Sequence, residues 1–153
     1  MNKNHVIIII LVIVIIALSA LVGISLLGSQ KDNVIVYNNT IKGVGTFNTT
    51  NVTNFTFDYA KDGTDYYIAN DSKTQVSVTG DKEVMEITKD DSERVNDSAA
   101  GHTIYKTTAN VGKYKGEVRY VSFLENGDKN QYIYLGSPDY NVTCMMVDTF
   151  RMF

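Results

Sequence analysis

The stretch Glu117–Leu135, EVRYVSFLENGDKNQYIYL, decides the fold expected for this chain. Apolar and polar residues alternate over Glu117–Leu124 and again over Gln131–Leu135, which is the period of a half-buried β-strand. Asn126 and Gly127 lie between the two runs, and both tolerate the positive φ angles of a tight hairpin turn. The stretch therefore predicts two neighbouring antiparallel strands.

A C-terminal helix is expected directly after this hairpin. Ser137 can cap its N-terminus, and Pro138 suits the first helical position because its missing N–H has no partner there. Apolar residues then recur at helical spacing and form one stripe, made of Val142, Met145, Met146, Thr149, Phe150 and Phe153. We expect this stripe to cover one face of the sheet.

Other strands are expected upstream by the same period. The segments that alternate are Phe55–Tyr59, Tyr66–Ala69, Val76–Val78 and His102–Thr107. Asp62-Gly63 marks a turn between the first two, Val84–Ile87 fits either a strand or a helical turn, and Asp90–Ala100 is expected to be a polar loop. The pattern predicts an antiparallel meander of about six strands.

An uncharged apolar run, Val6–Leu27, precedes this domain. At about 1.5 Å per residue, a helix over this run measures about 33 Å, enough for a hydrocarbon core of about 30 Å. A cleaved secretory signal is the alternative, but such signals have shorter apolar cores and a small-residue cleavage site after them. We therefore predict an uncleaved signal-anchor.

The predicted fold class is α+β: an N-terminal transmembrane helix followed by an antiparallel β-sheet domain with a C-terminal α-helix packed on the sheet. The predicted parts are a cytoplasmic N-terminus (1–5), the transmembrane signal-anchor helix (6–27), a tether (28–33) and an extracytoplasmic domain (34–153). Within the span, Ser19 and Gly23 form a small-xxx-small pair that allows close helix–helix approach, so a homodimer through the span is one alternative. Chance spacing is the other.

Seven of the fourteen asparagines begin an Asn-x-Ser/Thr acceptor triplet. They are Asn38, Asn48, Asn51, Asn54, Asn70, Asn96 and Asn141. N-glycosylation of these sites requires exposure outside the cytoplasm, although loops rich in Asn and Thr also produce such triplets by composition alone. Together with Lys3 before the apolar run, the triplets favour a cell-membrane protein with its N-terminus inside and its domain outside.

Composition excludes several partners and chemistries. The chain has 14 Lys and Arg against 17 Asp and Glu, and no basic block, so nucleic acid is not an expected partner. Its single Cys, Cys144, excludes an internal disulfide and leaves either a reactive thiol or a partly shielded inert one. We predict no catalytic, cofactor-binding or metal-binding residue and no cofactor, since neither His102 nor the acidic stretches have the spacing of a catalytic or metal site.

Tyrosines are concentrated on the two return strands, at Tyr66, Tyr67, Tyr132 and Tyr134. They either form a platform on which sugar rings stack or simply suit a half-buried pleated surface.

Three segments resemble a known family: GHTIYK at 101–106, GEVRYV at 116–121 and YIYLGSPD at 132–139. With the apolar run and the dense acceptor triplets, they resemble the repeated core of uncharacterised small single-pass surface proteins of methane-producing archaea. The ending, a strand pair followed by a helix, is similar to the sheet-plus-helix domains typified by the photosystem accessory protein PsbP. The resemblance implies a fold and a surface location and transfers no catalytic residue.

These observations favour a non-catalytic, membrane-anchored domain that binds an envelope polymer, a membrane protein or another ligand at the cell surface. An accessory subunit that docks on a membrane complex is the alternative, and a surface hydrolase a further one.

Overall fold

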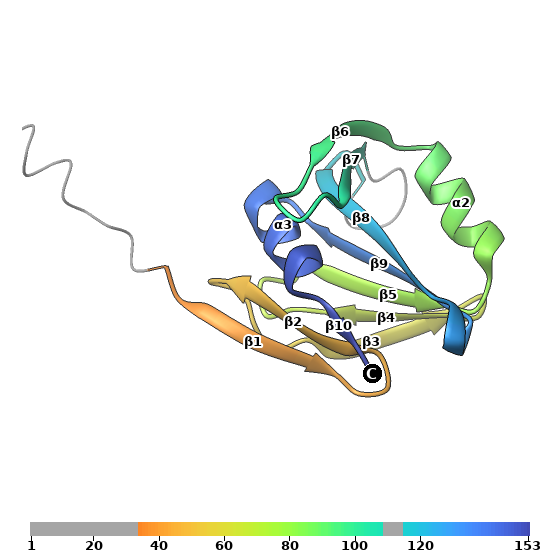
Figure 1. Cartoon of the computed structure of the whole chain (residues 1–153), viewed down its shortest axis with the longest axis horizontal. Coiled ribbons are helices and arrows are strands. Elements are labelled where there is room, and N and C mark those ends of the chain that lie inside the picture. The colour runs from red at the N-terminus through yellow and green to blue at the C-terminus, as the bar shows by residue number, and fades with distance from the viewer. Residues whose placement is uncertain (1–33, 109–114) are drawn as a thin grey trace, which may run out of the picture. The chain divides into compact units, whose positions relative to one another are not determined.

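The computed structural model describes residues 34–108 and 115–153, which form a sheet-rich domain with two α-helices (Figure 1). By its internal contacts, Ile35–Phe153 is one compact unit. The strands are β1 (Val36–Ile41), β2 (Gly45–Thr50), β3 (Thr56–Lys61), β4 (Thr64–Ile68), β5 (Gln75–Thr79), β6 (Glu93–Asp97), β7 (Thr103–Thr108), β8 (Val118–Asn126), β9 (Gln131–Ser137) and β10 (Arg151–Met152). The helices are α2 (Lys82–Asp90) and α3 (Tyr140–Thr149), and a 3₁₀ turn, η2 (Gly127–Lys129), joins β8 to β9.

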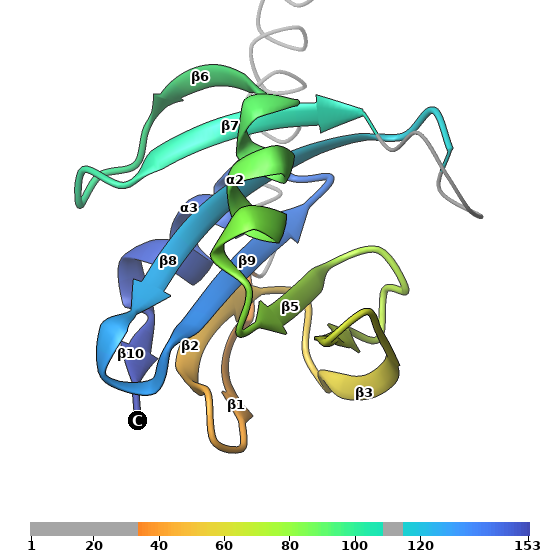
Figure 2. The same ribbon diagram turned by 90° about the vertical axis from the view of Figure 1, so that its right-hand side faces the viewer.

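The strands form two sheets. The larger has the order β3-β4-β5-β9-β8-β7-β6 and the smaller the order β1-β2-β10, with every neighbouring pair antiparallel. β9 lies at the centre of the larger sheet, between β5 and β8. Figure 2 shows α2 over one face of this sheet and α3 behind the opposite face.

Two turns show how local sequence sets the strand pairing. Asp62 and Gly63 have φ angles of 49° and 74° and form the expected two-residue turn between the paired residues Lys61 and Thr64. The β8–β9 turn differs from the expected one. Asn126 there has a φ of −108°, and Asn130 is the left-handed residue, with a φ of 49°, because the connection passes through η2.

The main core lies where α3 packs between the two sheets. α3 contacts β2 of the smaller sheet and β8 and β9 of the larger one. The buried residues of this core are Ile41, Val44, Phe47, Val76, Ile104, Ile133, Leu135, Val142, Met146, Val147 and Phe150. The rings of Phe47 and Phe150 stack with their centroids 5.7 Å apart, which joins β2 to the end of α3.

α3 begins and ends at other residues than the sequence predicts. Its N-cap is Asp139 rather than Ser137, and the Asp139 carboxylate accepts the N–H groups of Asn141 and Val142 at 2.8 and 3.4 Å. The helix ends at Thr149, because the chain then extends into β10 and pairs with β2.

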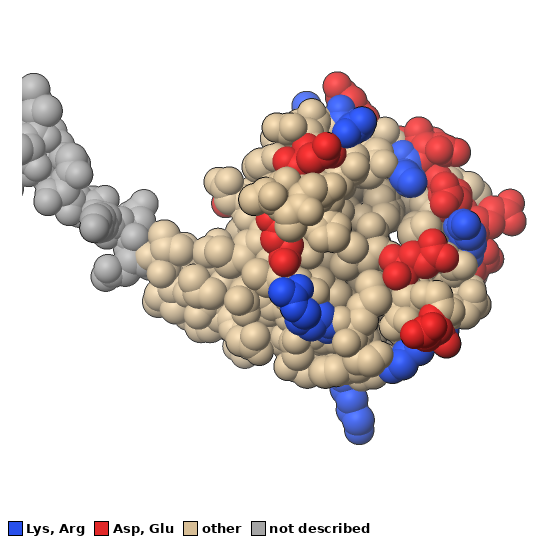
Figure 3. Space-filling model, viewed as in Figure 1, with Lys and Arg blue, Asp and Glu red and all other residues tan. Residues whose placement is uncertain are grey.

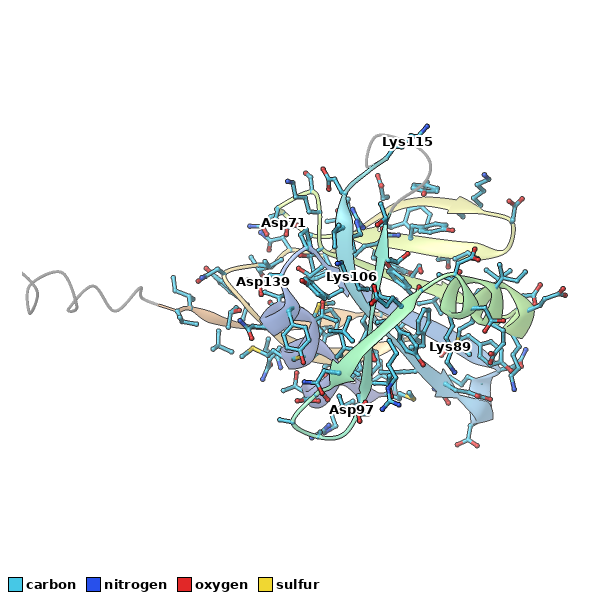
Figure 4. The ribbon with its side chains drawn as sticks, turned by 90° about the horizontal axis from the view of Figure 1, so that it is seen from above. Asp71, Lys89, Asp97, Lys106, Lys115 and Asp139 are labelled. Carbon is cyan, nitrogen blue, oxygen red and sulfur yellow. The ribbon has the colours of Figure 1, made fainter. Side chains whose placement is uncertain are left out.

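A polar network holds the N-terminal end of α3 against the start of β5. Thr74 donates to Asp71 at 2.6 Å, and its hydroxyl lies 3.1 Å from that of Ser137, which accepts the N–H of Asp139. Figure 4 shows Asp71 and Asp139 at the same end of the domain. Because Thr74 and Ser137 are buried, these bonds satisfy polar groups that water cannot reach.

Two further elements differ from the expectations. The ambiguous Val84–Ile87 belongs to α2, whose N-cap Asp81 accepts the N–H of Glu83 at 2.9 Å. The expected polar loop Asp90–Ala100 contains the edge strand β6, all of whose residues are exposed. A strand with no buried face shows no apolar alternation, which is why the pattern missed it.

The predicted fold class, which begins with a transmembrane helix, is wrong as a whole. The description of the chain as a transmembrane protein is wrong with it. Within residues 34–108 and 115–153, neither helix is long and apolar enough to cross a membrane. α2 has nine residues and α3 ten, so each measures about 15 Å, half of a hydrocarbon core. The run Val6–Leu27, with Ser19 and Gly23, lies outside the described residues.

Gly45 allows a close approach of β10 to β2, and this generates a prediction. A Cβ at Gly45 would lie 2.5 Å from the carbonyl oxygen of Arg151 and 2.8 Å from the Phe150 ring. Gly45→Ala is therefore expected to lower the free energy of unfolding by about 1–3 kcal/mol, measured by urea denaturation. Gly127→Ala is the control, since no atom lies within 4 Å of its Cβ position. Equal stabilities of the two variants would contradict the prediction.

Candidate functional site

A cavity of about 590 Å³ lies between α2 and one face of the larger sheet. Its lining residues come from α2 and from strands β3, β4, β5, β7, β8 and β9. Figure 2 shows α2 crossing this face in front of β8 and β9. The volume is within the range of small-molecule sites in proteins, so this cavity is the candidate functional site.

One row of side chains crosses five strands at the base of this cavity. Strand register places Tyr59 opposite Tyr66, Tyr66 opposite Ser77, Ser77 opposite Tyr134, and Tyr134 opposite Phe123. Directly opposed residues of antiparallel strands share a face of the sheet. Ser77 is the smallest residue of the row, so the cavity has room between the tyrosines on either side of it.

Aromatic rings form both ends of the row. Tyr59 and Tyr66 stack with centroids 4.5 Å apart and an interplanar angle of 16°. Phe123 packs edge-on against Tyr134, with centroids 5.7 Å apart and an angle of 70°. These contacts fix the orientation of the rings relative to one another.

The tyrosines of the two return strands do not all face this cavity. Tyr66, Tyr132 and Tyr134 line it. Tyr67 packs against the main core and makes an edge-on contact with Phe57 at 5.8 Å. Residues next to each other in a strand point to opposite faces, so Tyr66 and Tyr67 cannot belong to one platform.

Arg119 is the charged residue at the base of the cavity, and the sequence analysis did not select it. Its side chain is 4% exposed, and its Nη1 donates to Oε1 of Gln75 at 3.1 Å. The hydroxyl of Tyr134 lies close enough to Arg119 for the positive charge to act on it. Arg119 could have been identified from the sequence, because its charge lies on the same strand face as the apolar Val121 and Phe123.

Tyr134 is held protonated beside Arg119. Burial raises the pKa of Tyr134 to about 12, although the positive charge of Arg119 acts in the opposite direction. Gly136 makes room for its ring, because a Cβ there would lie 2.7 Å from the Tyr134 hydroxyl. Tyr134 is therefore a neutral phenol that can donate a hydrogen bond into the cavity.

Hydroxyl groups supply the remaining polarity of the lining. They belong to Thr64, Ser77, Thr79, Thr88, Thr107 and Thr108. Asp91, an exposed residue that follows α2, is the one carboxylate among the lining residues that the structure describes. The lining thus combines aromatic faces, one buried positive charge and several hydroxyl groups.

The acceptor asparagines lie away from this lining, and glycosylation at them stays a prediction. Asn48 is half-buried, whereas the other six, Asn38, Asn51, Asn54, Asn70, Asn96 and Asn141, are exposed. Asn38 donates to the Asn48 side chain at 3.0 Å across the β1–β2 hairpin. In Figure 3 the region of this hairpin has few charged side chains, and charges gather toward the α2 side.

The structure also places the other residues weighed from the sequence. Cys144 is partly buried on α3, where burial raises the pKa of its thiol and Tyr140 is its hydrogen-bond partner. His102 is half-buried at the start of β7. Within 34–108 and 115–153, no group of three or more His, Cys, Asp or Glu residues could hold a metal ion.

No family model, no curated protein and no solved structure matches this chain. The resemblances to archaeal surface proteins and to PsbP-like domains therefore stay predictions.

The pKa of Tyr134 predicts how stability changes at high pH. Its value is raised from 10.0 to about 12, so its stabilising contribution is complete below pH 10 and is lost as pH rises through about 12. At about pH 11, Tyr134→Phe should leave the phenolate absorbance of the folded protein unchanged, because Tyr134 still holds its proton there. Loss of one phenolate's absorbance in the variant at that pH would contradict the burial.

Proposed function

We propose that this domain is non-catalytic and binds a saccharide unit in the cavity between α2 and the larger sheet. The observation that carries the proposal is the lining itself, in which stacked tyrosines stand beside a set of hydroxyl groups. A sugar ring has the matching chemistry. Its C–H face packs on an aromatic ring, and its hydroxyl groups exchange hydrogen bonds with Ser, Thr and Tyr.

The size and rigidity of the cavity support binding. A site of about 590 Å³ can bury most of a ligand of one or two rings. The row Tyr59, Tyr66, Ser77, Tyr134 and Phe123 is attached to five hydrogen-bonded strands, so its geometry exists before the ligand arrives. A preformed site loses less conformational entropy on binding.

The composition of the lining favours binding over hydrolysis. Glycoside hydrolysis normally uses two carboxyl groups on either side of the scissile bond. Asp91 is the single carboxylate among the described lining residues, and no His or Cys accompanies it there. A surface hydrolase is therefore the weaker of the two proposals.

We propose further that the domain works outside the cytoplasm, where an envelope polymer would supply the saccharide. The density of acceptor triplets supports this location.

Filling the cavity tests the proposal. Ser77→Trp places an indole in the middle of the aromatic row and is expected to abolish binding of methyl glycosides measured by titration calorimetry. Thr56→Trp, an exposed position of β3 outside the lining, is the matched control and should bind as the unchanged protein does. Thr88→Trp fills the cavity from α2 if the first variant does not fold.

Two results would refute the binding role. One is the absence of heat from a panel of neutral and acidic methyl glycosides with the unchanged protein. The other is binding that survives both cavity-filling variants. Release of methanol from the same glycosides would instead support the hydrolase.

A further inference from the structure

We infer that the ligand of this site is a saccharide chain of two or more units and that one of its rings packs on Tyr59, at the exposed end of the cavity. The inference rests on the proposed function and specifies the length of the ligand. It starts from a feature that binding of a single sugar unit does not require, namely an exposed aromatic ring that lines the cavity from the edge of the sheet.

The row of side chains at the base of the cavity is most exposed at its β3 end. Tyr59, the member of the row that β3 supplies, is 47% exposed. The other four members, Phe123, Tyr134, Ser77 and Tyr66, are half-buried. β3 is an edge strand of the larger sheet, and all of its residues are exposed. The site is therefore open to solvent where Tyr59 lines it.

The length of the row exceeds the size of one sugar ring. Ser77 lies in β5 and Tyr59 in β3, with β4 between the two strands. Neighbouring strands are about 4.8 Å apart, so these two positions are separated by about 10 Å. Opposite atoms of a six-membered ring with bonds of about 1.5 Å lie only about 3 Å apart. A ligand that fills the space at Ser77 and also contacts Tyr59 therefore has at least two rings.

The Tyr59 ring is oriented before a ligand arrives. It stacks on the ring of Tyr66 with centroids 4.5 Å apart, and strand register places the two residues directly opposite each other on β3 and β4. The stack thus holds an exposed ring beside a half-buried one along the same row. A sugar ring that packs there removes apolar surface of both partners from water, and the orientation of the tyrosine costs little additional entropy.

A β-bulge puts Tyr59 on the cavity side of β3. The β3–β4 register shifts between Phe57 and Tyr59, so that Phe57 pairs with Tyr67 and Tyr59 pairs with Tyr66. Tyr67 packs against the main core, whereas Tyr66 lines the cavity. In a regular strand, residues two positions apart share a face, so Phe57 and Tyr59 lie on opposite faces only because of the bulge. Phe57 is accordingly exposed but lies outside the lining.

The experiment varies the length of the ligand. Methyl glycosides of one, two and three β-1,4-linked units of glucose or of N-acetylglucosamine are titrated into the full chain by calorimetry. In at least one of the two series, three units are expected to bind about tenfold more tightly than one, because the added rings bury the exposed end of the row. Tyr59→Ala should remove this gain and leave the affinity for one unit within about twofold. Phe57→Ala is the matched control, an exposed aromatic residue of the same strand outside the lining, and should keep the gain.

The outcomes separate the inference from the proposed function. Equal affinity for one, two and three units would overturn the saccharide chain and leave saccharide binding standing. A gain with length that survives Tyr59→Ala would overturn the contact with Tyr59. If neither series binds at any length, the inference is overturned, and the wider panel of methyl glycosides decides whether the proposed function stands. If Tyr59→Ala does not fold, Tyr59→Leu takes its place, since it keeps an apolar side chain on β3 and removes the ring.

Discussion

The alternation of side chains along β9 is the constraint on which both the core and the cavity depend. β9 is hydrogen-bonded on both sides and has a helix over each face. Ile133 and Leu135 face α3 and are fully buried, while Tyr132 and Tyr134 face α2 and line the cavity. A register shift of one residue would exchange the two sets, so the packing of α3 also fixes which side chains the cavity receives.

Strand β9 also explains how the positive charge of Arg119 is accommodated inside the domain. Arg119 lies two residues before Val121, which pairs with Gly136 of β9, and the absent side chain of Gly136 leaves room for the Tyr134 ring. The amide oxygen of Gln75 then accepts a hydrogen bond from the guanidinium, and the Tyr134 phenol lies nearby. A buried cation with polar neighbours costs less free energy than an isolated one.

Some elements can be predicted from the local pattern of apolar and polar residues, because one face of each element is buried. The β8–β9 pair and the Asp62-Gly63 turn belong to this class, as does the helical segment around Val142 and Met146. Others carry no such pattern. β6 has every residue exposed, and β1 and β2 form from a segment rich in Asn and Thr whose burial depends on α3. β10 forms only because the chain after Phe150 reaches the edge of β2.

By itself, the sequence determined the period of the strands, the positions of two turns and the presence of tyrosines on the return strands, because these depend on neighbours along the chain. Only the tertiary structure decided which tyrosines share a face. Register brings Tyr59, Tyr66, Tyr134 and Phe123 from four strands into one row and sends Tyr67 to the core. The tertiary structure also decided that Arg119 lies at the base of a cavity, because the covering helix α2 comes from a segment far from Arg119 in the sequence.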